Sequence, residues 1–563
     1  MRNPAKTFSS WHALYGPIYT VWLPHPMIVM ASHEVLKEAL IRQGIGTKLT
    51  SDWESVFKKF WSGPSGYIWS MFTKNPEHGD GIILCEGERW EHIREFAHKI
   101  FRNFGLGRTQ MEEKIMDNIN YMIAHIDGKL QGNKKISLDL DEPISLCVAN
   151  IIQDFVLGKS YEFGDPQFRK FKSLIDAVLA DVASKPVQLV NAYPILAYLP
   201  IPALRRYKEN GFALQRYFLN VIREHKDRLQ MDGEPRDFME AFLREMALQR
   251  DNPHFNEFTL ALASGDAKII HYRSRVDTPA YALLSYNTMG CGTDQIYRLD
   301  MQSMFSYHKC SRYFLNVIRE HKDRLQMDGE PRDFMEAFLR EMALQRDNPH
   351  FNEFTLALAS GDLWTGGMET TVTTLRWGFA YLLYHPSVQK KCYNEIYQVF
   401  GDEQPCYARR KQLPYVEATI AELQRITNVL PWAIPHRTTE DVELLGFRLP
   451  KGTVVLPQYG TVHHDSRYFP EPEKFKPERF LDGDGCFKRR PEMNPFGMGK
   501  RTCLGENLAR YELFLLLTTL IQKYEFLPIE GEPLPSLQRS LGITNVPMNY
   551  KCMVVPRKSS VAV

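Results

Sequence analysis

The residues with the clearest chemical potential are a cysteine and its glycine-rich surroundings at residues 496–505 (FGMGKRTCLG), directly before a predicted helix. A cysteine at a helix N-terminus lies beside unpaired backbone N–H groups and the positive end of the helix dipole, which favour a thiolate. The glycines remove side chains, so a flat ligand could approach the backbone, and Arg501 supplies a cation for an anionic group of that ligand. A single thiolate at Cys503 without companion ligands suits haem iron better than zinc. The alternative is a buried structural cysteine.

A second candidate site is residues 366–371 (GGMETT), inside a long helical pattern. Two adjacent glycines in a helix cost roughly 1 kcal/mol each relative to alanine, so they require a reason. A ligand approaching the helix face would supply one, and close helix packing is the alternative. The Thr370 hydroxyl can bond the carbonyl four residues earlier and open the helix locally. Together with Glu369 it offers an acid and a hydroxyl that can relay protons.

Three charged patterns are weaker signals on their own. Glu422 and Arg425 lie three residues apart on a predicted helix, where a solvated ion pair is the default interpretation. Trp90 and Arg94 lie one turn apart on an amphipathic helix, so by default they are a core residue and a surface charge. The basic run at residues 488–490 is by default a solvated face.

The elements that must position these residues are mostly helices. Hydrophobic periodicity predicts helices over residues 90–102, 111–130, 168–183, 217–229, 354–384, 387–400, 416–427 and 506–524. Residues 18–23 and 27–31 predict a hairpin, and short strands are expected at residues 442–449 and 452–457. The sequence therefore predicts one domain, residues 1–563, that is mainly α with a small β component.

An internal duplication interrupts this pattern, because residues 216–266 recur letter for letter at residues 312–362. Solenoid repeats diverge and occur at least about three times, so this is not a solenoid. Residues 267–311 separate the copies and show little periodicity. We therefore interpret residues 216–311 as an insertion, with a poorly ordered spacer at 267–311. Only the second copy runs directly into residues 366–371, so only it can form the first turns of that helix.

Composition excludes several classes of protein. The 563 residues carry a formal charge of +2, and 44% of them are hydrophobic, which excludes a disordered or collagen-like chain and gives no indication of nucleic-acid binding. The nine cysteines are scattered without C-x-x-C spacing, which argues against a disulfide framework or structural zinc. The most apolar helical patch, residues 513–517, is too short to cross a membrane, so the chain is expected to be soluble or to lie on a membrane.

Taken in order, these motifs resemble the cytochrome P-450 superfamily, in particular its microsomal animal branch. Residues 496–505 resemble the haem-binding loop, with Cys503 as axial ligand and Phe496, Gly497 and Arg501 beside the cofactor. Residues 366–371 resemble the oxygen-activation stretch. The resemblance joins Arg479, in PERF, to Glu422 and Arg425 as a structural triad. It also assigns Trp90, Arg94 and Arg437 to the haem propionates.

The resemblance implies a single haem-thiolate fold binding haem b, and a monooxygenase that inserts one oxygen atom of O2 into an apolar substrate such as a xenobiotic, fatty acid or steroid. Electrons would come from NADPH through a flavoprotein reductase, or from cytochrome b5, docking at the basic run 488–490. It also implies the cytoplasmic face of the endoplasmic reticulum, with peripheral membrane contact at the apolar segment 187–204 and no membrane anchor within this chain. A buried connection is the alternative for that segment. The rival functions are a haem-thiolate isomerase or peroxygenase, and a non-catalytic product disabled by the insertion.

Overall fold

The computed structural model describes residues 4–42, 81–103, 109–210, 334–341 and 353–557, with short gaps inside these ranges. The predicted helix at 217–229, the whole first copy of the duplication (216–266) and the spacer 267–311 lie outside the described residues. The helices are α1 (Pro4–Tyr15), α2 (His33–Lys37), η1 (Glu38–Arg42), α3 (Gly87–Asn103), α4 (Thr109–Leu130), α5 (Asp141–Val156), α6 (Pro166–Ala183), α7 (Lys185–Ala192), α14 (Glu353–Tyr384), α15 (Pro386–Phe400), η6 (Tyr407–Gln412), α16 (Pro414–Thr427), α17 (Tyr459–His463), η7 (Pro477–Phe480) and α18 (Glu506–Lys523).

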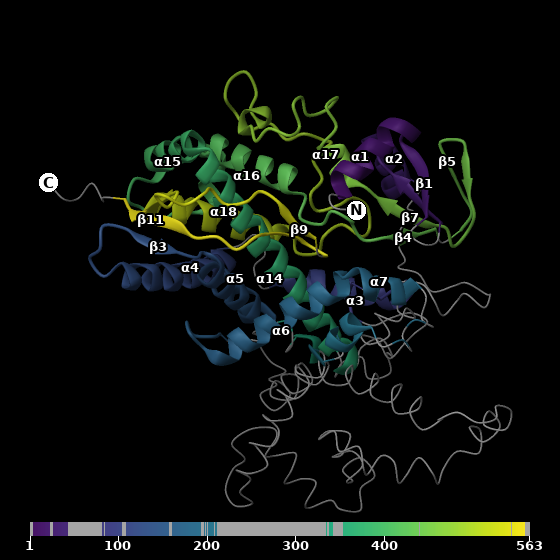
Figure 1. Cartoon of the computed structure of the whole chain (residues 1–563), viewed down its shortest axis with the longest axis horizontal. Coiled ribbons are helices and arrows are strands. Elements are labelled where there is room, and N and C mark those ends of the chain that lie inside the picture. Colours follow the sequence, from purple (N-terminus) through teal and green to yellow (C-terminus); the bar gives the residue numbers. More distant parts are fainter. Residues whose placement is uncertain are drawn as a thin grey trace, which may run out of the picture.

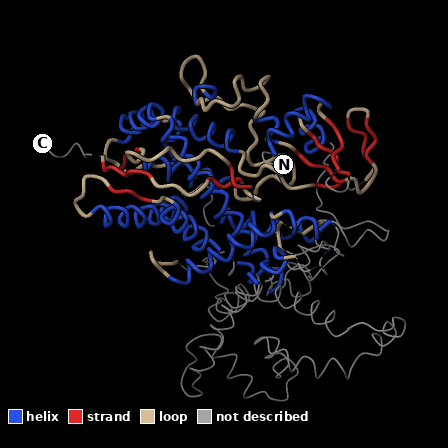
Figure 2. The backbone as a smooth tube through the Cα atoms, viewed as in Figure 1, coloured by secondary structure: helices blue, strands red, loops and turns tan. Residues whose placement is uncertain are grey.

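Short strands form the minor component of the fold, as the sequence predicted. They are β1 (Ile18–Trp22), β2 (Pro26–Met30), β3 (Ile136–Leu138), β4 (His436–Arg437), β5 (Val442–Leu444), β6 (Phe447–Leu449), β7 (Val454–Pro457), β8 (Tyr524–Leu527), β9 (Arg539–Leu541), β10 (Asn545–Pro547) and β11 (Cys552–Pro556). One sheet has the order β1-β2-β7-β4, another β3-β11-β8, and β5-β6 and β9-β10 form hairpins. Helices dominate the described part of the chain (Figure 2).

Each predicted helix within the described residues exists, with ends that differ from the expected ones by at most three residues. The hairpin also exists, and Tyr19 pairs with Val29 in antiparallel register. The helix expected over 506–524 ends at Lys523, because Tyr524 starts β8 and pairs with Pro556 of β11.

Helix α5 was not predicted from the sequence. Almost every one of its residues is buried, from Pro143 to Val156. A helix surrounded by protein on all sides has no polar face, so it lacks the amphipathic periodicity on which the prediction depended. It packs along α14, which runs through the middle of the molecule between α5 and α6 on one side and α16 and α18 on the other (Figure 1).

The long helix α14 starts at Glu353, inside the second copy of the duplicated segment, and continues without a break through residues 366–371. The expectation that the second copy supplies the first turns of this helix is therefore confirmed. One large apolar cluster contains side chains of α4, α5, α14, α15, α16 and α18. The small sheet around β1 and β2 packs with α1 beside it at one end of the molecule (Figure 1).

Candidate functional site

The segment that carries Cys503, residues 494–505, is called the cysteine loop below. Its turns need glycine, since Gly497 and Gly499 have φ of +83° and +76°. A Cβ on Gly499 would lie 2.3 Å from the carbonyl oxygen of Leu40 in η1, and one on Gly497 would lie 3.5 Å from the Tyr459 hydroxyl. These two glycines thus meet needs of the chain itself, and the sequence-based idea of ligand approach is not required to explain them.

Backbone hydrogen bonds fold the cysteine loop back on itself. The N–H of Cys503 donates to the carbonyl of Phe496 at 2.9 Å, and the Thr502 N–H donates to Gly499 at 3.1 Å. Gly505 is the N-cap of α18, so Cys503 lies at a helix N-terminus as predicted. The side chain of Cys503 is exposed, yet burial by the surrounding protein raises the pKa of its thiol.

Two groups oppose the effect of burial on the Cys503 thiol. The N–H of Gly505 hydrogen-bonds to Cys503 and the guanidinium of Arg94 lies nearby, and each lowers the pKa of the thiol. Cys392 and Cys552, which are buried, have other neighbours than Cys503. Cys392 contacts the Thr419 hydroxyl at 3.4 Å, and burial raises the pKa of its thiol to about 12. Burial likewise raises the pKa of Cys552 to about 12.

Aromatic and basic side chains of α3 meet the cysteine loop. The guanidinium of Arg501 lies 3.8 Å from the centre of the Trp90 ring, and that of Arg94 lies 5.4 Å from it. Arg94 also donates to the Thr502 carbonyl at 2.5 Å, and Arg501 donates to the Cys85 carbonyl at 2.8 Å. Arg501 is therefore tied to the chain as well as available to a ligand.

Arg437 of β4 completes the basic group, because it lies 3.6 Å from Glu86 with both side chains buried. The negative charge of Glu86 also raises the pKa of Arg501. Burial lowers the pKa of Arg501 to about 9 and lowers that of Arg94, so both cations are held where water stabilises them poorly.

A dianionic ligand such as haem fits these residues. Glu86 faces Arg437 and also interacts with Arg501, and Arg94 is a third guanidinium group beside the cysteine loop. The indole N–H of Trp90 is buried and has no hydrogen-bond partner in the described part of the chain, so it has a donor to offer. Two propionates would balance this charge and accept from these donors.

The three members of the expected triad meet in the structure. Arg425 donates to both carboxylate oxygens of Glu422, at 2.7 and 2.8 Å, and Arg479 donates to the same carboxylate at 3.1 Å. The side chains of Glu422 and Arg425 are fully buried, so the default interpretation of a solvated pair does not apply. Arg425 also donates to the His463 carbonyl at 2.8 Å, which ties α16 to α17.

The adjacent glycines Gly366 and Gly367 of α14 have different surroundings. A Cβ on Gly367 would lie 2.6 Å from Cδ1 of Ile152 in α5, whereas a Cβ on Gly366 would meet no atom within 4 Å. The close-packing explanation weighed from the sequence therefore applies to Gly367, and the ligand explanation stays a prediction for Gly366. Gly367 allows close helix packing, and Gly366 leaves a helix face open.

Thr370 lies on that open face, and its hydroxyl donates to the Gly366 carbonyl at 2.7 Å, as expected. Glu369 shares the face but has other partners, since it accepts from the Thr544 hydroxyl at 2.9 Å. Burial, followed by the nearby Asp176, raises the pKa of Glu369, while Thr544 and then Lys172 lower it. This acid is thus biased towards carrying a proton beside an open helix face.

Sequence reasoning missed two carboxylates around the site. Asp362 of α14 accepts from the N–H groups of Ile82 and Ile83 at 2.6 and 2.8 Å, and burial raises its pKa to about 6. Glu86 is the other. Glu86 lies three residues before Arg89, the same spacing as Glu422 and Arg425, but spacing alone could not distinguish it from a surface ion pair.

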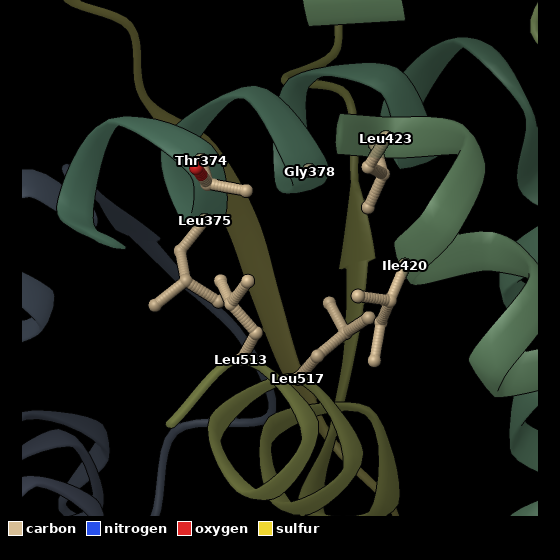
Figure 3. A pocket seen from close by; sticks show the side chains of 7 residues that line it. All are labelled: Thr374, Leu375, Gly378, Ile420, Leu423, Leu513 and Leu517. Carbon is tan, nitrogen blue, oxygen red and sulfur yellow. The ribbon is translucent and has the colours of Figure 1, made fainter. Parts of the chain in front are cut away.

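A small apolar gap lies between α14, α16 and α18, lined by Thr374, Leu375, Gly378, Ile420, Leu423, Leu513 and Leu517 (Figure 3). Its volume of about 10 Å³ leaves room for no more than a water molecule. No group of three or more potential metal-ligating side chains occurs among the described residues. In the same part of the chain, no helix is long and apolar enough to cross a membrane.

Comparison with known proteins gives one consistent family. A family model described as cytochrome P450 matches residues 1–266 and 295–554. A 3-ketosteroid oxygenase of Caenorhabditis elegans is 32% identical over 98% of this chain and 76% of its own length. Cytochrome P450 2G1 of Oryctolagus cuniculus is 29% identical over 98% of this chain and 89% of its own. Cytochrome P450 2J3 of Rattus norvegicus is 32% identical over 86% of this chain and 76% of its own.

Proposed function

The chain belongs to the cytochrome P450 family, whose members are haem-thiolate monooxygenases, and we propose that Cys503 is its axial haem ligand. The observation that carries the proposal is the environment of this sulfur. It is exposed, lies at the N-terminus of α18, and has a guanidinium and a backbone N–H beside it. When bound, the haem supplies the activation of O2.

The residues proposed to hold the haem are those that surround Cys503. Arg94, Arg437 and Arg501 would neutralise the two propionates and hydrogen-bond to them, and the indole N–H of Trp90 would donate a further hydrogen bond. Phe496 and Gly497 form part of the cysteine loop before Cys503, and the Phe496 carbonyl accepts from the Cys503 N–H. The triad of Glu422, Arg425 and Arg479 holds the surrounding backbone and takes no part in the reaction.

Proton delivery is assigned to Thr370 and Glu369. Burial raises the pKa of the Glu369 carboxyl, and we assign to this group the delivery of a proton towards the open face. The Thr370 hydroxyl donates its proton to the Gly366 carbonyl, so its oxygen can accept a hydrogen bond from another group. The presence of both groups favours a monooxygenase over an isomerase or peroxygenase, because a protonation pair serves O2 cleavage.

The substrate class is proposed to be apolar and small, such as a xenobiotic, fatty acid or steroid. Similarity to a 3-ketosteroid oxygenase supports a steroid-sized substrate as the first to test. NADPH would supply electrons through a flavoprotein reductase or through cytochrome b5. Lys488, Arg489 and Lys500 are exposed beside the cysteine loop and suit an acidic donor.

The cytoplasmic face of the endoplasmic reticulum is the proposed location, with peripheral contact through the segment 187–204. Leu189 and Leu199 are 49% and 51% exposed there, while Val187 and Val190 are buried. The segment therefore combines a buried side with exposed leucines, which suits contact with a membrane surface.

Residues 216–311 are proposed to be an insertion into one domain. Two observations support this: α14 continues from the second copy, and the family match leaves out residues 267–294. Deleting residues 216–311 should raise the yield of soluble haem-bound protein. Loss of haem binding on deletion would instead make the segment part of the working fold.

The proposed function is tested by the ferrous–CO spectrum of the purified protein. Cys503→Ser should abolish the thiolate-type spectrum, because a neutral hydroxyl is a poor donor to iron. Cys392→Ser is the matched control and should keep it. A thiolate-type spectrum in the Cys503 variant would disprove the assignment. Reductase-dependent oxidation of NADPH then distinguishes a monooxygenase from an isomerase and from an inactive product.

A further inference from the structure

The short helix α17 lies between the triad and the cysteine loop. On one side Arg425 donates to the His463 carbonyl, and Gly460 approaches Asn428 so closely that a Cβ there would lie 2.1 Å from the Asn428 amide nitrogen. Asn428 itself has a φ of +42° and follows the end of α16. The position of α17 is therefore fixed by the end of α16.

The other side of α17 reaches the cysteine loop at two points. The backbone N–H of Met498 donates to the Tyr459 hydroxyl at 3.0 Å, and that of Asn494 donates to Nε2 of His463 at 3.1 Å. Tyr459 and His463 are four residues apart and so share one helix face. Their two partners are also four residues apart. Both contacts thus join the same face of α17 to the same stretch of loop.

The chemistry of these two acceptors suits a permanent attachment. His463 is 1% exposed, and burial lowers its pKa to about 3, so its ring stays neutral and Nε2 keeps its lone pair. Since Nε2 accepts, the ring proton is on Nδ1. Burial raises the pKa of Tyr459 to about 12, so the phenol also stays neutral. A backbone N–H that lost such an acceptor would be left unsatisfied.

The two hydrogen bonds to α17 affect Cys503 through the peptide group of Phe496. Phe496 lies between the two attached residues, and its carbonyl accepts from the Cys503 N–H at 2.9 Å and from the Thr502 hydroxyl at 3.3 Å. Fixing Asn494 and Met498 therefore fixes the carbonyl that orients Cys503.

We propose that Tyr459 and His463, here called the α17 clamp, are positioning residues that hold the cysteine loop in the conformation that presents the Cys503 sulfur to the haem. This inference rests on the proposed role of Cys503. Neither residue belongs to the motifs by which the family was recognised in the sequence, and neither touches the substrate or the reacting atoms.

The test measures how fast the thiolate-type ferrous–CO form converts to the thiol-type form. Each lost hydrogen bond should speed the conversion by about fivefold in Tyr459→Phe or His463→Leu, and by about 25-fold in the double variant. His463→Gln, which keeps an acceptor at the end of the side chain, should restore a rate near that of the wild type.

Matched controls separate positioning from general destabilisation. His464→Leu removes the neighbouring histidine, whose Nδ1 lies 3.0 Å from the Gly460 carbonyl and not at the loop. Tyr524→Phe removes a buried hydroxyl that donates to Asp127 at 2.6 Å, away from the loop. Both should lower the thermal midpoint while leaving the conversion rate unchanged.

The outcomes are distinct. A wild-type protein without a thiolate-type spectrum would overturn the proposed function. A wild type with that spectrum, whose Tyr459→Phe and His463→Leu variants convert no faster than their controls, would overturn the α17 clamp alone. Tyr459→Phe removes a single atom, so it decides the question even if His463→Leu does not yield haem-bound protein.

Discussion

The glycines of the cysteine loop and those of α14 can be compared position by position. Gly497 and Gly499 adopt positive φ angles, and Gly499 also lies against a backbone carbonyl that cannot move aside. Gly366 and Gly367 have ordinary helical geometry, and only Gly367 meets a neighbour, the flexible end of Ile152. The loop needs glycine for its conformation, whereas α14 needs it for packing and for an open face.

Both regions combine local polar contacts with distant ones. In the cysteine loop, the carbonyl of Phe496 accepts from the N–H of Cys503, and Arg94 of α3 donates to the Thr502 carbonyl. In α14, Thr370 donates to the Gly366 carbonyl, and the carboxylate of Glu369 accepts from Thr544, which lies 175 residues further along the chain. The local contacts follow from a short sequence, whereas the distant partners do not.

The largest effect is expected for Gly499→Ala. The substitution combines a strained φ with a Cβ 2.3 Å from the Leu40 carbonyl oxygen, and it should cost about 2–3 kcal/mol of stability. Urea unfolding and the haem content of the purified protein measure this effect. Gly505→Ala is the matched control, because a Cβ there meets nothing within 4 Å. Equal stability of the two variants would contradict the comparison.

Glu512 of α18 should make stability depend on pH. Burial raises the pKa of Glu512 to about 8, and the Thr371 hydroxyl of α14 donates to its carboxylate at 3.1 Å. The folded state therefore holds a proton that the unfolded state releases above about pH 4.5, so this contribution to stability falls as pH rises towards 8.

The measurement is the urea midpoint at several pH values for the wild type and for Glu512→Gln. Between pH 5 and pH 7 the wild type should lose about 2 kcal/mol relative to the variant, since the amide cannot ionise. Parallel pH profiles would show that Glu512 ionises equally in both states.

The fold was largely predictable because its helices carry polar faces. The ends of α15 and α16 followed from periodicity, and β1 and β2 followed from their flanking prolines. Helix α5 was not predicted, because burial on all sides removes that signal. The features of the site can also be divided into those that the sequence made evident and those that it did not. Cys503 was evident from its motif, but the burial of Glu422 and the pairing of Glu86 with Arg437 join residues far apart in sequence.

Thr370→Ala should separate chemistry from stability. The variant should bind haem and unfold within about 0.5 kcal/mol of the wild type, as expected for a residue on an open helix face. Product formed per NADPH consumed should fall severalfold, because without proton delivery reduced oxygen escapes as peroxide. Thr374→Ala is the control, since its hydroxyl also bonds a carbonyl one turn earlier. An unchanged ratio would remove Thr370 from the mechanism.

The smallest effects are expected for alanine at Gly366 and Gly367 of α14, and they should have opposite signs. Gly366→Ala adds a methyl group that meets nothing and should stabilise the protein by up to about 1 kcal/mol. Gly367→Ala places a Cβ 2.6 Å from Cδ1 of Ile152 and should destabilise it by about 1 kcal/mol or more. Adding Ile152→Val removes that atom, so the double variant should recover most of the loss. Urea unfolding measures all three. If Gly367→Ala were as stable as Gly366→Ala, the contact between α5 and α14 would not constrain this position, and the open face around Thr370 would no longer be distinguished from the packed one.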